Sequence, residues 1–270
     1  MGNRIKKIIR NFRGLWSQEI HRIIYNWKVY VCIVVYFLVI FISTKEAGSI
    51  FFKLMNAYQS MLQINLISNF SKLLVLVASV PFATSYYEDI QNGYINYIVS
   101  RSGTGVYIFT KVTVCAISSF LVSFAGLTMY SLLCCIISGH GVSVGLIPEG
   151  AKFYDVASGS MPWMVVFIMC FFFSIVSCVY AVMGMTLSAF LPNKFVAVTG
   201  TLFMNILVEE INYYLPEFLS LYFIRNCNTA YGQDTKVIVI GSVMVVLGYI
   251  ILSGLVFSRY VKRRISYESH

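Results

Sequence analysis

The chain has 270 residues, of which 58% are hydrophobic and 11% are charged. A soluble domain carries roughly a quarter charged residues and cannot bury this much apolar surface, so the composition excludes an ordinary soluble protein. The net charge of +9 does not indicate nucleic-acid binding, because the basic residues gather at the two ends, where lipid headgroups and the positive-inside rule explain them. The apolar runs are continuous rather than alternating, which favours an all-α integral membrane protein.

The N-terminal segment 4–27 precedes any span. Isoleucine, leucine and aromatic residues recur there at helical spacing, and Lys and Arg occupy much of the remainder. This pattern predicts an amphipathic helix in the membrane interface. A mitochondrial targeting helix shares the pattern, but it would not normally lead straight into a polytopic body. We expect no cleaved signal, because the first apolar run begins only at Val29 and no small-residue cleavage site follows it.

Six apolar segments follow, and together they predict one transmembrane domain over 1–270. They cover about 29–43, 66–87, 112–137, 163–191, 195–208 and 237–257. The segment 195–208 is short enough to be a buried or re-entrant helix instead. However, seven Lys or Arg precede the first span and four follow the last. Both ends are therefore expected in the cytoplasm, which requires an even number of spans, and six is the prediction.

Several kinds of catalytic site are not expected. There is no Gly-rich phosphate loop, so the chain should not hydrolyse nucleotide itself. The histidines (His21, His140 and His270) are too scattered for a metal site or a triad. The seven cysteines lack ligand spacing and mostly lie in apolar runs, as packing residues do. We therefore predict no enzyme activity, catalytic residue, metal or cofactor in this chain.

Two features of the apolar runs bear on transport. Few ionisable residues lie deep within them, whereas ion-coupled carriers need such groups at mid-membrane, so energy is expected from another subunit. The fourth span has small residues along one face, which predicts a helix-packing seam or, alternatively, the lining of a pathway. These residues are Ser174, Ser177, Ala181, Gly184 and Ser188. The acids Glu209 and Glu210 are interpreted as the outer boundary of the fifth span.

The segment that follows the second span is the most informative. Glu88 and Asp89 end that span, and a half-polar helix over about 88–100 is predicted next, before the chain re-enters the membrane near Lys111. Such a helix lies just outside the bilayer with aromatic and aliphatic side chains left unburied. It therefore needs a partner, unless it is another interfacial helix.

This segment resembles the cytoplasmic loop of type-2 ABC transporter permeases, the membrane subunits of ATP-driven exporters. In that family a Glu ends the second helix, a Gly follows about five residues on, and a hydrophobic stretch leads to Ser-Arg and then Lys. Glu88, Gly93, Ser100-Arg101 and Lys111 match in order and spacing. Tyr94 and Val99 depart from the pattern, which has a small Thr and a Pro there. The family also has an N-terminal connecting helix, six spans, a very short fourth-to-fifth turn and a re-entrant outer segment, which 209–230 would supply.

The resemblance implies the transmembrane subunit of an ABC exporter in a bacterial plasma membrane. It would act with a second permease, identical or related, and with two ATPase subunits that bind the ATP and magnesium. Segment 88–100 would be the coupling helix against the ATPase. Its implied coupling residues are Glu88, Asp89, Gly93, Tyr94, Tyr97, Ile98 and Arg101.

The resemblance favours a hydrophobic or amphipathic substrate, above all a peptide such as a toxin or bacteriocin, for export or immunity. Two other functions stay open at the level of sequence. One is an ATP-independent channel or secondary carrier, and the other is a regulatory membrane subunit that transports nothing.

Overall fold

The computed structural model describes residues 2–46, 61, 68–138, 153, 156, 163–212, 214–227 and 234–268. Apart from short turns, these residues form helices, and the all-α prediction is confirmed for this part of the chain. Five helices are long and apolar enough to cross a membrane, which makes the chain a multi-pass integral membrane protein. They are α2 (Trp27–Glu46), α8 (Thr104–Ser138), α10 (Trp163–Phe190), α11 (Lys194–Asn212) and α13 (Thr235–Glu268).

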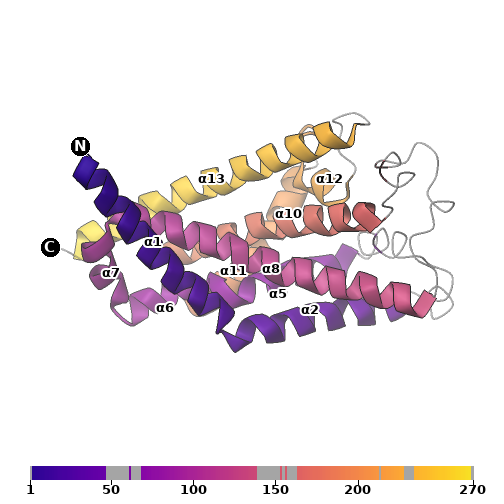
Figure 1. The fold of residues 1–270 in the computed structure, drawn as a ribbon, viewed down its shortest axis with the longest axis horizontal. Helices are drawn as coiled ribbons and strands as arrows, with labels where there is room; N and C mark the ends of the chain where they lie inside the picture. Colours follow the sequence, from indigo (N-terminus) through magenta and orange to yellow (C-terminus); the bar gives the residue numbers. More distant parts are fainter. Residues whose placement is uncertain are drawn as a thin grey trace.

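A sixth helix, α5 (Ser68–Ala83), packs within this bundle against α2, α8, α10 and α11. Its 16 described residues begin where the described part of the chain resumes, at Ser68. Figure 1 shows both chain termini at one end of the bundle, which we call the terminus end, together with α6 (Ser85–Gln91) and α7 (Tyr94–Ser102). The short helix α12 (Leu221–Arg225) lies at the other end, the α12 end.

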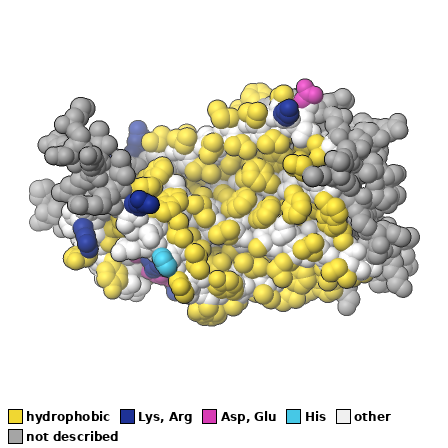
Figure 2. All heavy atoms as spheres, viewed as in Figure 1, with side chains coloured by type: hydrophobic (Ala, Val, Ile, Leu, Met, Phe, Trp, Pro, Cys, Tyr) yellow, Lys and Arg dark blue, Asp and Glu magenta, His cyan; other side chains and the backbone are white. Residues whose placement is uncertain are grey.

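The burial pattern of the bundle is that of a protein surrounded by lipid. The central helix α10 buries most of its side chains, whereas α13 exposes large apolar ones such as Ile240, Met244 and Ile251. Figure 2 shows a broad belt of hydrophobic side chains across the middle of one face, with Lys and Arg toward its two ends. Water would penalise so large an apolar surface, and a bilayer would cover it.

The end of the second predicted span differs from the expectation of one helix over 66–87. Residues 66 and 67 lie outside the described part, α5 ends at Ala83, and α6 begins at Ser85. Pro81 has no amide hydrogen to donate to the preceding turn, and its ring crowds that turn, which weakens the helix at this point.

The predicted single helix 88–100 is also divided. Gly93 has a φ of 68°, in the left-handed region that glycine adopts without a Cβ clash, and it separates α6 from α7. Glu88 and Asp89 therefore belong to α6, whereas Tyr94 and Tyr97 belong to α7.

The other element ends extend beyond the predicted spans. The third begins at Thr104, and α13 continues through the basic tail to Glu268. The helix α11 continues to Asn212, so the first residues of segment 209–230 are its last turn rather than a separate segment. A turn at Pro216 leads on to α12, while 228–230 lie outside the described residues.

Candidate functional site

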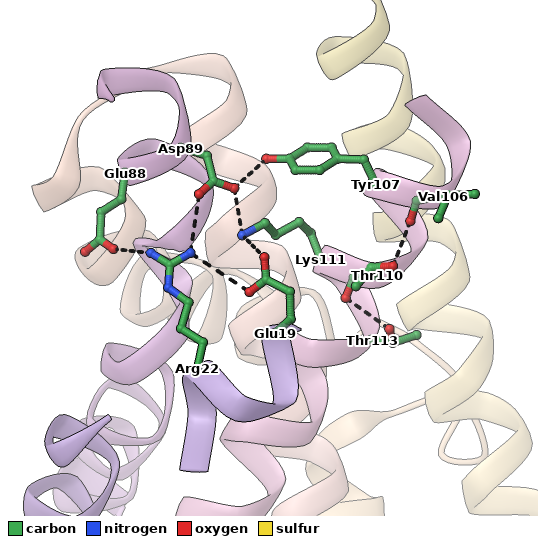
Figure 3. A network of polar contacts seen from close by, with 9 residues as sticks. All are labelled: Glu19, Arg22, Glu88, Asp89, Val106, Tyr107, Thr110, Lys111 and Thr113. Atoms are coloured by element: carbon green, nitrogen blue, oxygen red, sulfur yellow. Dashed lines mark hydrogen bonds and ion pairs between the residues drawn. The ribbon is translucent and has the colours of Figure 1, made fainter. Parts of the chain in front are cut away.

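A network of charged side chains joins three helices at the terminus end of the bundle (Figure 3). Helix α1 (Gly2–Ile24) and helices α6 and α8 contribute two residues each. We call this the Lys111 network, and it consists of Glu19, Arg22, Glu88, Asp89, Tyr107 and Lys111.

Lys111 is the centre of this network. Its side chain is 1% exposed, and Nζ lies 2.8 Å from Glu19 Oε1 and 2.7 Å from Asp89 Oδ2. Tyr107 donates a hydrogen bond of 3.0 Å to the same Asp89 oxygen, and Nζ lies 5.4 Å from the ring centre of Phe82. A buried ammonium is stable only when it is paired, so Lys111 holds α1 and α6 against α8.

Arg22 makes a second connection between α1 and α6, nearer the surface. Its guanidinium donates to Glu88 at 3.0 Å and to Asp89 at 3.3 Å. Partial burial acts to lower the pKa of Arg22, but Glu19, Asp89 and Glu88 outweigh it and raise the pKa above its usual value. Thr84 donates to Glu88 at 3.1 Å and so orients that carboxylate.

Helical spacing explains why these side chains converge. Glu19 and Arg22 are three residues apart on α1, and Tyr107 and Lys111 are four apart on α8, so each pair shares one helix face. The sequence prediction included Glu88 and Asp89 but missed Glu19, Arg22, Tyr107 and the pairing of Lys111. The available signal was Lys111 itself, a cation flanked by apolar residues, since such a residue requires a carboxylate partner.

The helix α7 presents the remaining predicted coupling residues. Tyr94 is 57% exposed and Tyr97 is 68% exposed, whereas Ile95 is buried beneath them. Gly93 and Arg101 are exposed, and Ile98 is half-buried against the core. Helix α7 therefore packs against the rest of the protein through Ile95 and Ile98. Its aromatic face, formed by Tyr94 and Tyr97, is exposed in the described part of the structure.

The small residues of the fourth span all lie in the interior, on α10. Ser174, Ser177, Ala181, Gly184 and Ser188 are buried. A Cβ at Gly184 would collide with Thr201 of α11, so glycine allows these two helices to approach closely. Ser119 of α8 donates to the backbone carbonyl of Ser177 at 3.2 Å. The face therefore contacts α8 and α11, and both interpretations, a packing seam and the lining of a pathway, stay predictions.

A second cluster of charges, which we call the Arg225 cluster, lies toward the α12 end. Arg225 is 4% exposed, and its Nη1 lies 3.0 Å from Glu209 Oε1. Lys72 of α5 approaches the other carboxylate oxygen of Glu209 at 3.4 Å. The guanidinium also lies 5.7 Å from the ring centres of Phe173 and Tyr222. The sequence prediction treated Glu209 as a boundary acid and did not anticipate this cluster.

Among the described residues, no group of three or more His, Cys, Asp or Glu is placed to hold a metal ion. Comparison with known proteins gives no match to a family model, to a curated protein or to a solved structure. The function is therefore inferred from the chemistry and placement of the chain's own residues.

Proposed function

We propose that the chain is the permease subunit of an ATP-driven ABC exporter, with six transmembrane helices and both termini in the cytoplasm of a bacterial cell. Helix α5 is then the second crossing, which its packing against α2, α8, α10 and α11 supports. Both termini lie at the same end of the bundle, which supports an even number of crossings. The basic residues of the N-terminal segment and of the C-terminal tail support a cytoplasmic side there.

The observation that carries the proposal is that α7 exposes aromatic side chains, while ion pairs fix the adjoining helix α6 to the bundle. Tyr94 and Tyr97 project from α7, while the Lys111 network fixes the adjoining α6 to α1 and α8. Aromatic side chains are enriched at the centres of protein interfaces, where they bury large areas at a low cost in entropy. A partner that binds α7 would therefore act on an element that cannot easily move independently of the bundle.

The coupling mechanism follows from this connection. An ATPase subunit that binds α7 would push or pull on α6 when it closes around ATP and magnesium. Because Asp89 and Lys111 are joined at 2.7 Å, this displacement would reach α8. Helix α8 has 35 residues and is roughly 50 Å long, so it can transmit a rigid-body motion toward the other side of the membrane.

The proposed complex contains two ATPase subunits and a second permease, identical or related, in contact with membrane lipids. Its proposed substrate is a hydrophobic or amphipathic molecule, most favourably a peptide of the toxin or bacteriocin kind. The uncharged and aromatic-rich surfaces of the spans suit such a substrate.

Co-purification tests the proposal. The tagged full-length chain is isolated from its native membranes in a mild detergent, and its partners are identified by mass spectrometry. We expect an ATPase subunit with a phosphate-binding loop, and ATP hydrolysis by the recovered complex. Recovery of the chain without any ATPase, together with transport activity in vesicles that lack ATP, would favour a channel or secondary carrier instead.

A further inference from the structure

A polar face of α11 continues from the centre of the bundle to the Arg225 cluster. Thr201, Asn205, Glu209 and Asn212 follow one another at spacings of three or four residues, so they share one side of the helix. The hydroxyl groups of Thr201 and Ser79 form a hydrogen bond of 3.1 Å, which directs this side toward α5. Lys72 of α5 contacts Glu209 further along the same side.

Several polar groups of this face are buried without compensation. Asn205 is fully buried and Asn212 is 5% exposed. Within the described part of the structure, neither amide has a hydrogen-bond partner, and the same is true of Arg225 Nε. Buried polar groups are almost always hydrogen-bonded, and an amide left unpaired inside a membrane protein is costly. The two unpaired Asn amides share one face of α11, and Glu209 on the same face contacts Arg225 of α12, so a guest with matching polar groups would form the missing bonds there.

The chemistry of the unpaired groups specifies the guest. Among the unpaired atoms, Arg225 Nε and the two Asn Nδ2 groups are hydrogen-bond donors, and the two Asn Oδ1 atoms are acceptors. In the Arg225 cluster, the buried Arg225 and the 30% exposed Lys72 face the single carboxylate of Glu209. An oxyanion accepts from these donors and balances the second cation, and an N–H or O–H group of the same guest, such as a peptide amide, donates to the Asn Oδ1 atoms. The aromatic rings of Phe173 and Tyr222 around the guanidinium provide an apolar surface for an attached hydrocarbon group.

We propose that Asn205, Asn212 and Arg225 form a binding site for the oxyanion group, carboxylate or phosphate, of an amphipathic molecule. The proposal does not depend on the ATPase partner, because all of its residues belong to this chain and lie far in sequence from α6 and α7. A carboxylate would come from a substrate such as a fatty acid or a peptide C-terminus, and a phosphate would come from a lipid headgroup. Titration with a carboxylate ligand and with a phosphate ligand distinguishes these two sources.

The test measures thermal unfolding of the full-length protein at neutral pH, purified free of added phospholipid in the uncharged detergent dodecyl maltoside and titrated with dodecanoate, dodecyl phosphate or the uncharged dodecanol. We expect one of the two anions, or both, to raise the unfolding midpoint beyond the effect of dodecanol. A larger effect of dodecanoate identifies a carboxylate site, and a larger effect of dodecyl phosphate identifies a lipid headgroup site. Equal effects of the anions and the alcohol would overturn the proposal.

Substitutions test whether the anions raise the unfolding midpoint by binding at this site. Arg225→Gln and Asn205→Leu should each weaken the anion effect about tenfold or more, since each removes donors to a charged group. Asn205→Leu should also raise the midpoint of the ligand-free protein, because an apolar side chain replaces an unpaired amide. Ser118→Ala is the control, since Ser118 is buried on α8 and donates only within its own helix, to Cys115 at 3.2 Å. If Arg225→Gln does not fold, Asn205→Leu decides alone, and an unchanged anion effect in that variant would contradict the proposal.

Discussion

The two charge clusters of this protein differ in the sign of their excess charge. In the Lys111 network, three carboxylates enclose two cations, and the ammonium of Lys111 contacts two of these carboxylates within 2.8 Å. In the Arg225 cluster, two cations share one carboxylate, and Arg225 Nε has no partner among the described residues. The first cluster therefore has one excess negative charge, whereas the second has one excess positive charge and a buried donor without a hydrogen-bond partner.

This difference indicates different roles for the two clusters. A closed network of ion pairs fixes helices relative to one another, which suits the base of a coupling element. A cluster with unused donors and excess positive charge suits the binding of an outside group. The comparison predicts that the Lys111 network contributes more to stability, and that the Arg225 cluster responds more to added anions.

The largest expected effect comes from Lys111→Met. This change leaves Glu19 and Asp89 buried without their cation, and it should lower the free energy of unfolding by about 3–5 kcal/mol. The measurement is equilibrium unfolding by sodium dodecyl sulfate in mixed micelles. Lys194→Met, which removes an exposed lysine at the start of α11, is the matched control and should be nearly neutral. Equal stability of the two variants would show that the Lys111 network is not structural.

The sequence predicted the helices better than their connections. Long apolar runs specify spanning helices because the backbone must bond within each segment, which is why α8, α10 and α13 coincide with predicted spans. The break at Gly93 was missed, because a hydrophobic pattern does not report a left-handed backbone. The pairing of Lys111 with Glu19 joins residues 92 positions apart and depends on the packing of α1 against α8. Helical periodicity within one segment carries no information on such a contact.

A smaller loss is expected from Glu209→Gln. Arg225 then keeps a hydrogen-bond acceptor but loses its counter-charge, so the free energy of unfolding should fall by about 1–3 kcal/mol. The same change increases the positive charge of the Arg225 cluster and should strengthen the response to dodecanoate or dodecyl phosphate. The neighbouring Glu210→Gln, at an exposed position, serves as the control. A weaker anion response in Glu209→Gln would contradict the assigned role.

The smallest change in stability is expected from Lys72→Met. The Lys72 side chain is 30% exposed and lies 3.4 Å from Glu209, so this ion pair should contribute no more than about 1 kcal/mol. The same unfolding measurement applies. A loss as large as that of Lys111→Met would remove the contrast between the two clusters.

The central claim is that the aromatic face of α7 binds an ATPase. Its most direct test is ATPase recovery with the tagged full-length chain that carries Tyr94→Asp, Tyr97→Asp or, as a control, Tyr214→Asp. Tyr214 is an exposed tyrosine that follows α11, toward the α12 end. All three variants should unfold within about 0.5 kcal/mol of the unaltered protein, because each changes an exposed side chain. We expect recovery to fall about tenfold or more for Tyr94→Asp and Tyr97→Asp, since a buried charge penalises an interface, and to stay unchanged for Tyr214→Asp. Equal recovery with all three variants would contradict the coupling role of α7.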